Sequence, residues 1–452
     1  MRLETGTHPE LPVTLAPRMN ALAWAVGLGA LAVGAAIWLH AIWPPTQIGY
    51  DFGMYLAAAH SVASGGDLYQ QLGALTHDAR PGSAGVRASG YVYPPLLAVA
   101  LAPPVRLGLS DQGAWLLWNL LGFGAILWMG YELNRGLRGR ADWRSAWLGA
   151  LAFAGATLLG AVATYDLALG QADLLVTALA VGACGLWLRR NPWAALPLGA
   201  AIAIKPTMGL ILLVWLWKGD WRAVARGVAA TAALLVAPFV VVGARATQEY
   251  LTFLTQWNAF NANAEYINQS PYGMLLRLFT PNVYTQPLLA TPWLVTPLRA
   301  LVILGAVFWW TRAVPRPPTS DRALGLGECL LALPLILIVS PLAEDIHYCI
   351  LLPALVGLGY LAWARGLARQ PAAWVLWATL AFFCIPRMQE LVLPDHLFTL
   401  PGQDNMQIGP LIILLRSGAL LYGALATLIA GGLILRDTRT SQHSGTPVHS
   451  TG

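Results

Sequence analysis

Long apolar runs recur along this chain, and they limit what it can fold into more than any other feature. A transmembrane helix needs about 20 consecutive apolar residues. Charged residues make up only 11% of the 452 residues, whereas a soluble domain carries roughly 25%. The runs expected to cross a membrane lie at 21–43, 112–131, 146–163, 172–188, 222–242, 297–312, 324–341, 348–363, 372–385 and 407–435. The pattern predicts an all-α, polytopic integral membrane protein.

One further apolar stretch is interrupted at Lys205-Pro206. Its halves, 194–204 and 207–217, are each about 16 Å long as helices, short of the ~30 Å hydrocarbon core. Two short tilted helices fit this pattern, and so does one re-entrant hairpin. Both place Lys205 at the tip, and counting the halves separately gives about 12 membrane helices.

Two long loops separate the spans, one after residue 43 and one at 244–296. The apolar piece Leu96–Pro103 in the first is too short to cross and is expected to be re-entrant or interfacial. Residues 1–435 read as a single membrane domain. The tail 436–452 is polar and rich in Ser and Thr, so it is expected to be disordered.

The positions of Lys and Arg predict the orientation of the chain, because short cytoplasmic loops carry an excess of both. With a cytoplasmic N-terminus, most of the 27 basic residues and every Arg cluster in the short loops face the cytoplasm. The opposite orientation would export all the Arg pairs. We therefore expect a multi-pass cell-membrane protein with both termini cytoplasmic and the two long loops outside.

Asp51 is the first acid after the first apolar run. Residues 52–64 read as a short helix ended by Gly65-Gly66, and Phe52, Tyr55 and Leu56 begin an apolar face that continues through Ala59 and Val62. Such a face is expected to rest on the membrane surface, which would hold the carboxylate near lipid head groups. The alternative is a solvated loop acid or a helix N-cap.

Other polar residues are predicted at this outer level, where ionisable groups are costly and are candidates for function. Lys205 beside a helix break suits a phosphate, or it extends to the interface. Gln171 opens a span or caps it, His347 is a site residue or a satisfied interfacial histidine, and Arg416 contacts phosphate or packs helices. The remaining candidates are Tyr55, Tyr93, Asp345, Asn268 and Gln269.

Several motifs are missing from the sequence. There is no Walker A loop, no GxGxxG before a helix, no HExxH and no adjacent D-x-D pair in the first loop, so neither a nucleotide cofactor nor a dedicated metal site is expected. The four cysteines lie in or beside apolar runs without CxxC spacing. The basic residues are spread over short loops, so the net charge of +6 does not indicate nucleic-acid binding.

Taken in order, these segments resemble glycosyltransferase family 87, whose members are polyprenol-phosphate-mannose-dependent α-mannosyltransferases of the GT-C superfamily. The resemblance covers about residues 20–435. It rests on Asp51-Phe52-x-x-Tyr55 with Gly-Gly-Asp-Leu-Tyr69, Tyr91-Val92-Tyr93-Pro94-Pro95-Leu96, Gly170-Gln171-x-Asp173-Leu174-Leu175, Lys205-Pro206-Thr207, Asn268-Gln269-Ser270 and Ser340-Pro341…Asp345-x-His347. The family's late motif usually reads Ser-Pro-x-Ser-Trp-Asp-His-His. Here Ala343, Glu344 and Ile346 replace Ser, Trp and the first His, which bears on the sugar or acceptor more than on the reaction class.

The resemblance implies inverting transfer of a sugar, mannose in the family, from a polyprenyl-phosphate carrier to the hydroxyl of a lipid or glycan acceptor on the outer face. The family's catalytic aspartate maps onto Asp51, which would take the proton of that hydroxyl. Lys205, Arg416 or His347 would stabilise the leaving phosphate, and Tyr93 and Gln171 would orient sugar hydroxyls. A lipid or glycan transporter is the main alternative, and a structural subunit of an envelope assembly is a third.

Overall fold

The protein is described from a computed structural model, which covers residues 17–43, 48–69, 90–138, 143–256, 264–265, 267–282, 284–316, 319–384 and 418–444. These residues form helices and contain no β-strand. The helices are α1 (Pro17–Ile42), α2 (Tyr50–Ser64), α4 (Leu96–Arg106), α5 (Asp111–Arg138), α6 (Trp143–Leu159), α7 (Ala161–Leu169), α8 (Asp173–Leu188), η1 (Pro192–Ala194), α9 (Ala195–Ile204), η2 (Pro206–Gly209), α10 (Leu210–Trp217), α11 (Trp221–Thr255), α13 (Pro271–Phe279), η3 (Pro292–Leu294), α14 (Val295–Ala313), α15 (Arg322–Leu330), α16 (Leu333–Val339), η4 (Asp345–Leu351), α17 (Leu352–Ala364), α18 (Pro371–Cys384) and α21 (Ala419–Ser444).

The helices follow the apolar runs, as the sequence predicts, and an all-helical membrane protein is confirmed. Among the described residues, six helical segments are long and apolar enough to cross a membrane, or seven if one bent pair counts as a span. Six more apolar helices have 10–17 residues. The count of about 12 spans remains a prediction.

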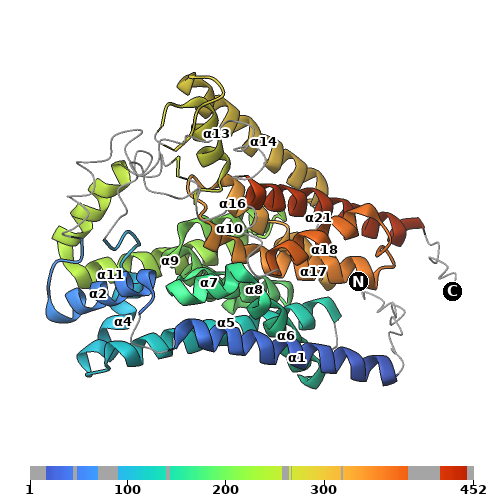
Figure 1. The fold of residues 1–452 in the computed structure, drawn as a ribbon, viewed down its shortest axis with the longest axis horizontal. Helices are drawn as coiled ribbons and strands as arrows, with labels where there is room; N and C mark the ends of the chain where they lie inside the picture. Colours follow the sequence, from blue (N-terminus) through green and yellow to red (C-terminus); the bar gives the residue numbers. More distant parts are fainter. Residues whose placement is uncertain are drawn as a thin grey trace.

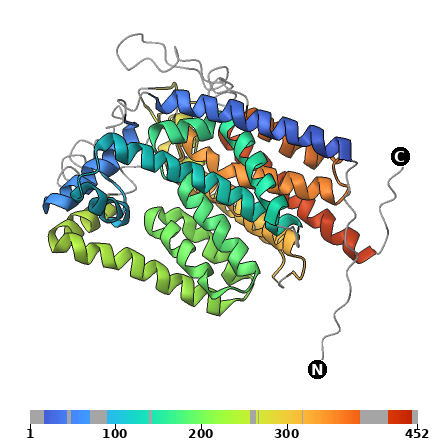
Figure 2. The same cartoon turned by 90° about the horizontal axis from the view of Figure 1, so that it is seen from below.

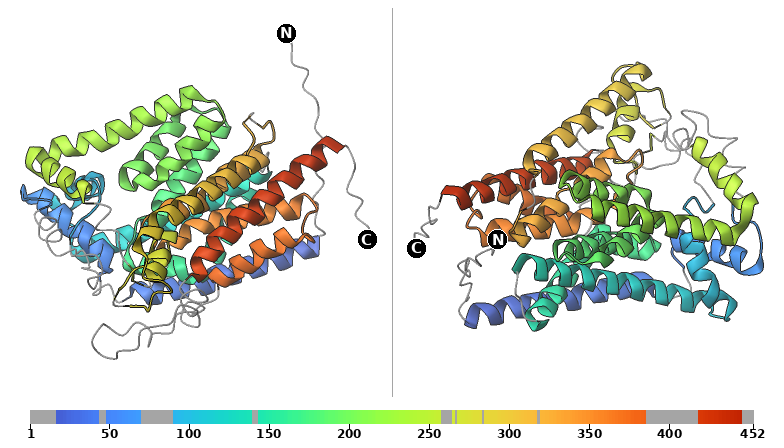
Figure 3. Two further views of the ribbon diagram at one scale, coloured as in Figure 1. Left: turned by 90° about the horizontal axis from the view of Figure 1, so that it is seen from above. Right: turned by 180° about the vertical axis from the view of Figure 1, so that it is seen from behind.

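The helices pack side by side as one bundle (Figure 1). α1 lies along one side against α6, and α14 and α21 lie on the other side. The start of α1 and the end of α21 lie at the same end of the bundle, while α2 and α4 lie at the opposite end (Figures 2 and 3). The two ends of the bundle carry different charged residues.

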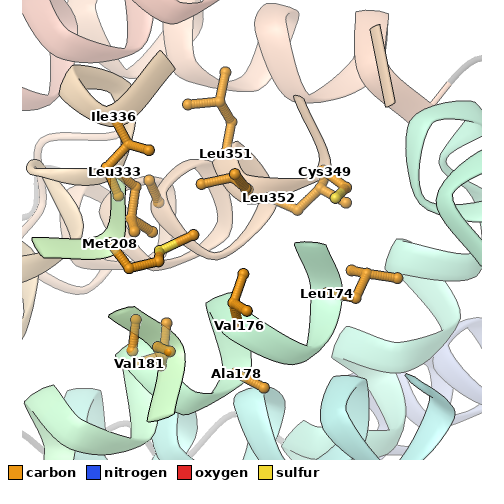
Figure 4. Packing of buried hydrophobic residues seen from close by; sticks show 14 of the residues in the cluster. Leu174, Val176, Ala178, Val181, Met208, Leu333, Ile336, Cys349, Leu351 and Leu352 are labelled. Carbon is orange, nitrogen blue, oxygen red and sulfur yellow. The ribbon is translucent and has the colours of Figure 1, made fainter. Parts of the chain in front are cut away.

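The centre of the bundle is filled by branched aliphatic side chains. Leu174, Val176 and Val181 of α8 face Leu333 and Ile336 of α16 and neighbouring residues of η4 and α17 (Figure 4). Burial of such side chains stabilises a protein by about 1.5–3 kcal/mol each in water. In a membrane this driving force is absent, and close packing holds the helices together instead.

Basic residues gather at the end where α21 finishes. There Arg189 pairs with Glu132 at 2.7 Å, and Glu328 accepts both Lys218 at 2.6 Å and Arg439 at 2.7 Å. Each of these charges has a partner, which limits the cost of burying it.

Three helical segments are broken within their length. The expected span 146–163 ends at Leu159 and turns by 82° into α7. The stretch 194–217 is divided at Lys205, as the sequence predicts. α11 continues past the expected end at 242 but kinks at Gly243, whose φ of 88° favours glycine.

Two sequence predictions are wrong. The apolar face of α2 does not rest on a membrane surface, because Phe52, Tyr55, Leu56 and Ala59 are buried within the protein. The tail is not disordered from residue 436, because α21 continues to Ser444 and its Arg439 reaches Glu328. The first part of the expected span 407–435 lies outside the described residues.

Candidate active site

Asp51 lies in the first turn of α2, at the point where this helix meets the end of α7. Gly49, the residue before α2, lies so close to the backbone of α7 that a Cβ at this position would be 2.4 Å from the carbonyl oxygen of Ala168. Gly170 ends α7 with a left-handed φ of 74°, and a Cβ there would lie 2.5 Å from that of Phe52. Two glycines thus allow the backbones to approach and bring Asp51 beside the turn at 170–172.

Aromatic rings fix the position of α2. The ring of Phe52 stacks on Trp118 of α5 at 5.3 Å, and Tyr55 meets Trp118 edge-on at 5.6 Å. Tyr55 also meets Tyr93 edge-on at 5.3 Å. Such pairs contribute about 0.5–1.5 kcal/mol beyond the area they bury, so the short helix is held rigidly although it is only four turns long.

Gln171 connects these aromatic residues to Asp51. Its Oε1 accepts hydrogen bonds from the hydroxyls of Tyr55 at 2.9 Å and Tyr93 at 3.3 Å. The same oxygen accepts the backbone N–H of Ala172, the residue before α8, at 3.3 Å. Helix α8 has no side-chain cap, so Gln171 does not cap it as the alternative expected. The Gln171 side chain hydrogen-bonds Asp51 as well. A carboxylate only accepts, so Gln171 donates its amide N–H to Asp51.

The Asp51 carboxyl group is 8% exposed. Its pKa is raised to about 6, chiefly by burial and then by the negative charge of Asp173, while Lys205 and the hydrogen bond from Gln171 act in the opposite direction. A carboxylate with a pKa near neutrality is matched to accept a proton during a reaction.

Lys205 lies at the break between α9 and η2 and does not extend to solvent, so the interface alternative is wrong. Its Nζ bonds Oδ1 of the fully buried Asp173 at 2.5 Å, and its side chain is 15% exposed. Asp173 begins α8 and also faces Nε2 of His347 at 3.6 Å. Asp166 of α7 adds a second buried carboxyl group beside this pair. Lys205 is therefore already paired with a carboxylate.

Tyr93 lies close to both Asp51 and the Lys205–Asp173 pair. Burial raises the pKa of its hydroxyl, Lys205 lowers it, and the charges of Asp51 and Asp173 raise it. The structure thus brings together six of the residues expected from the sequence: Asp51, Tyr55, Tyr93, Gln171, Lys205 and His347.

The bonding of His347 determines its protonation. Its Nδ1 accepts the backbone N–H of Glu344 at 3.1 Å, so that nitrogen carries no proton. The imidazole is neutral, and Nε2 carries the hydrogen that faces Asp173. His347 therefore offers a hydrogen-bond donor at this site rather than a positive charge.

Glu344 is a further carboxyl group at this site that was not among the expected site residues. Its pKa is raised to about 8, chiefly by burial and then by the charges of Asp51 and Asp345, while Lys205 acts in the opposite direction. Glu344 is accordingly protonated at neutral pH. The sequence marks Glu344 as unusual, because the family's late motif has a different residue at this position.

Asn268 and Gln269 support the loop that carries Glu344. Asn268 Nδ2 donates to the carbonyl of Pro341 at 3.2 Å, and the backbone N–H of Gln269 donates to Ala343 at 2.7 Å. Asp345 Oδ1 accepts the N–H of Ile346 at 2.9 Å, a local bond at the start of η4. Arg416 lies outside the described residues. Within the part of the chain that the structure covers, no three His, Cys, Asp or Glu side chains form a possible metal site.

A carboxylate poised to accept a proton, a nearby lysine and a donor imidazole suit transfer of a group from a phosphate to a hydroxyl. Comparison with known families agrees with this chemistry. The sequence pattern that defines glycosyltransferase family 87 matches residues 91–341, more than half of the chain. The chain belongs to glycosyltransferase family 87. As a family 87 protein with many apolar helices, it is a membrane glycosyltransferase.

Two curated mycobacterial proteins of this kind are similar along most of the chain. Both are named polyprenol-phosphate-mannose-dependent alpha-(1-2)-phosphatidylinositol mannoside mannosyltransferase. The protein from Mycobacterium tuberculosis is 28% identical over 368 residues, covering 78% of this chain and 79% of its own length. The protein from Mycolicibacterium smegmatis is 24% identical over 355 residues, covering 76% of each.

Proposed function

We propose that this family 87 protein is an inverting transferase that moves a mannosyl group from a polyprenyl phosphate to an acceptor hydroxyl outside the cytoplasm. The donor follows from the names of the two relatives. The observation that carries the mechanism is the buried Asp51 carboxyl group with a pKa raised to about 6, in one cluster with the Lys205–Asp173 pair.

In the proposed step, Asp51 takes the proton of the acceptor hydroxyl as that oxygen attacks the anomeric carbon of the sugar. The bond from this carbon to the phosphate oxygen breaks, and polyprenyl phosphate leaves with the electron pair. Attack from the face opposite the phosphate inverts the configuration. One base is sufficient, because the phosphate is a good leaving group and needs no acid.

The leaving phosphate gains negative charge during this step, and it needs donors that are already in place. Lys205 supplies the positive charge, and the N–H at Nε2 of His347 supplies a neutral donor. Asp173 holds both groups at distances of 2.5 and 3.6 Å. We assign Asp173 the role of positioning them, and Gln171 the role of orienting Asp51.

The transporter alternative gains no support. The family assignment favours a transferase.

The rate of transfer is expected to depend on pH through two carboxyl groups. Asp51 must be ionised to accept a proton, so activity should fall about tenfold for each pH unit below about 6. Above about pH 8, Glu344 ionises and places a second negative charge near the donor phosphate, which should raise the donor KM.

Measurement of kcat/KM for the donor from pH 5 to 9 checks this profile. Glu344→Gln keeps the size and hydrogen bonding of the side chain but cannot ionise, so it should remove the upper limb and leave the lower limb in place. An upper limb that persists in Glu344→Gln would assign it to another group.

The proposed orientation can be tested by cysteine labelling in intact cells. Exposed positions at His60 and Arg245, near the α2 end, should react with a reagent that does not cross membranes. Cysteines at Arg138 and Arg316 should react only after permeabilisation. Replacement of the half-buried Cys384 with Ala lowers the background. Labelling of Arg138→Cys from outside would invert the whole assignment.

A further inference from the structure

A cavity of about 260 Å³ lies at the opposite end of α8 and α9 from the candidate active site. It is bounded by the turn between α8 and α9 and the turn between α10 and α11. α8 has 16 residues, so the cavity lies about 24 Å from Asp173 along that helix. It shares none of its lining residues with the active site.

Three arginines line this cavity: Arg190, Arg222 and Arg226. The single carboxylate among the lining residues is Asp220, and it pairs with Arg190 at 3.6 Å, which leaves Arg222 and Arg226 in excess. Its Oδ2 accepts the indole N–H of Trp187 at 2.9 Å, and its Oδ1 accepts the N–H of Ala223 at 3.1 Å. The cavity therefore carries an excess of guanidinium groups, which bind phosphate through paired hydrogen bonds.

The surroundings of the cavity place it at the level of lipid head groups. Trp193 and Trp221 lie next to its lining residues and are 69% and 68% exposed. Exposed tryptophans are typical of the membrane–water interface. Beyond them, Leu196 of α9 and Val228 of α11 are also exposed, so an apolar surface begins where the basic rim ends.

We propose that this cavity binds the phosphate head group of an anionic phospholipid, with the acyl chains along the exposed sides of α9 and α11. Basic pockets between membrane helices bind anionic head groups in this way. The proposal relies on the membrane placement in the proposed function but not on the transfer chemistry. Its test therefore measures lipid binding and not sugar transfer.

The backbone of Arg190 offers a selective variant. Its φ of 58° is left-handed, and Arg190 is the one non-glycine residue with a positive φ among the described residues. Glycine adopts this conformation without steric cost. Arg190→Gly removes a guanidinium group and relieves the backbone. The ion pair that it loses with Asp220 is exposed and contributes little to stability, so any loss of lipid binding should come with an unchanged or higher Tm.

The experiment is a titration of the purified, full-length protein in detergent with phosphatidylglycerol, followed by native mass spectrometry and by Tm. The variant Arg190→Gly and the double variant Arg222→Gln/Arg226→Gln should each bind the lipid at least about tenfold more weakly than the wild type. Each variant loses charge-assisted hydrogen bonds to the phosphate. Arg369→Gln, an exposed arginine outside the cavity, is the matched control and should bind as the wild type does.

Phosphatidylglycerol should raise the Tm of the wild type when it binds. Phosphatidylcholine and inorganic phosphate are the comparison probes, and neither should reproduce this binding or this rise in Tm. Equal phosphatidylglycerol binding by the wild type and both cavity variants would overturn the proposal. An equal loss in Arg369→Gln would also overturn it, since binding would then follow total charge. A full Tm shift with inorganic phosphate would overturn the assignment to a lipid.

Discussion

Asp51→Asn is expected to lower the rate of sugar transfer at least about a hundredfold while donor binding persists. A general base contributes about 10²–10⁴-fold to a rate, and the amide of Asn cannot take the proton of the acceptor. The two side chains are nearly the same size, so the contacts of α2 with Trp118 and Gln171 should survive. Single-turnover kinetics with bound donor separate the chemical step from binding.

The same substitution should stabilise the protein, which distinguishes a lost base from a damaged fold. The pKa of Asp51 is about 6 in the folded protein and 3.8 unperturbed, so ionisation above pH 6 costs up to about 3 kcal/mol of stability. Because the folded pKa is raised, this cost is absent below about pH 4, grows between about pH 4 and 6, and stays constant above that. Asp51→Asn should therefore have the higher Tm at pH 7.5 and an equal Tm at pH 4.

Asp111→Asn is the matched control for this experiment. Asp111 lies in the first turn of α5, is half exposed and pairs with His60 at 3.0 Å. Its substitution removes an exposed acid near α2, so transfer should stay near normal. An Asp51→Asn enzyme that transfers sugar at the normal rate would show that the base lies elsewhere.

The second large effect is expected at Lys205, where binding and stability must be separated. Lys205→Ala leaves the fully buried Asp173 without its partner, and breaking a buried pair costs about 3–5 kcal/mol. A loss of activity in that variant alone would not distinguish a missing phosphate contact from a disturbed fold. The pair therefore has to be replaced together.

Asp173→Asn/Lys205→Met removes both charges and keeps the approximate size of each side chain. Replacement of a buried ion pair by uncharged groups is often neutral for stability, so the Tm should return close to that of the wild type. The kcat/KM for the donor should still be lower by about 10²–10³-fold, as when a single donor to a developing oxyanion is lost. Lys205→Arg should restore donor use partly at best, because an ammonium and a guanidinium group differ in shape.

Donor kinetics that are normal in the double variant would remove Lys205 from the site. A donor KM that rises while kcat is unchanged would mean that Lys205 binds the ground state and the transition state equally. The measurement therefore also reports at which stage the lysine acts.

The positions of the helices could be predicted from the sequence because the length and apolarity of a segment decide whether it can cross a membrane. The break at Lys205 was also predictable, since proline lacks the N–H that continues a helix. The turn at Gly160 was not. It lies within the continuous apolar run 146–163, and hydropathy is the same on both sides of the turn.

The surroundings of α2 could not be predicted for a related reason. Phe52, Tyr55 and Leu56 recur at helical spacing, and this periodicity marks an apolar face without showing what covers it. Lipid and protein are both apolar, so only the packing of Phe52 on Trp118, 66 positions later in the chain, distinguishes them.

The sequence predicted only part of the site, because it does not show which segments pack together. Membrane level and residue type suggested Asp51, Lys205 and His347, but not which outer acid would meet Lys205. Asp173 lies 32 positions before Lys205, and their contact depends on how α8 packs against α9. Glu344 could not be assigned because its raised pKa depends on burial in the folded protein and on the charge of Asp51, which is far away in the sequence.

The most direct test of Asp51 as the base and Lys205 as the phosphate ligand is a cryo-electron microscopy structure of Asp51→Asn with polyprenyl-phosphate mannose bound. The account predicts a phosphate oxygen within about 3 Å of the Nζ of Lys205. The side chain at position 51 should face the anomeric carbon from the side opposite the phosphate. A donor whose phosphate lies away from Lys205, or whose sugar lies out of reach of position 51, would contradict the mechanism.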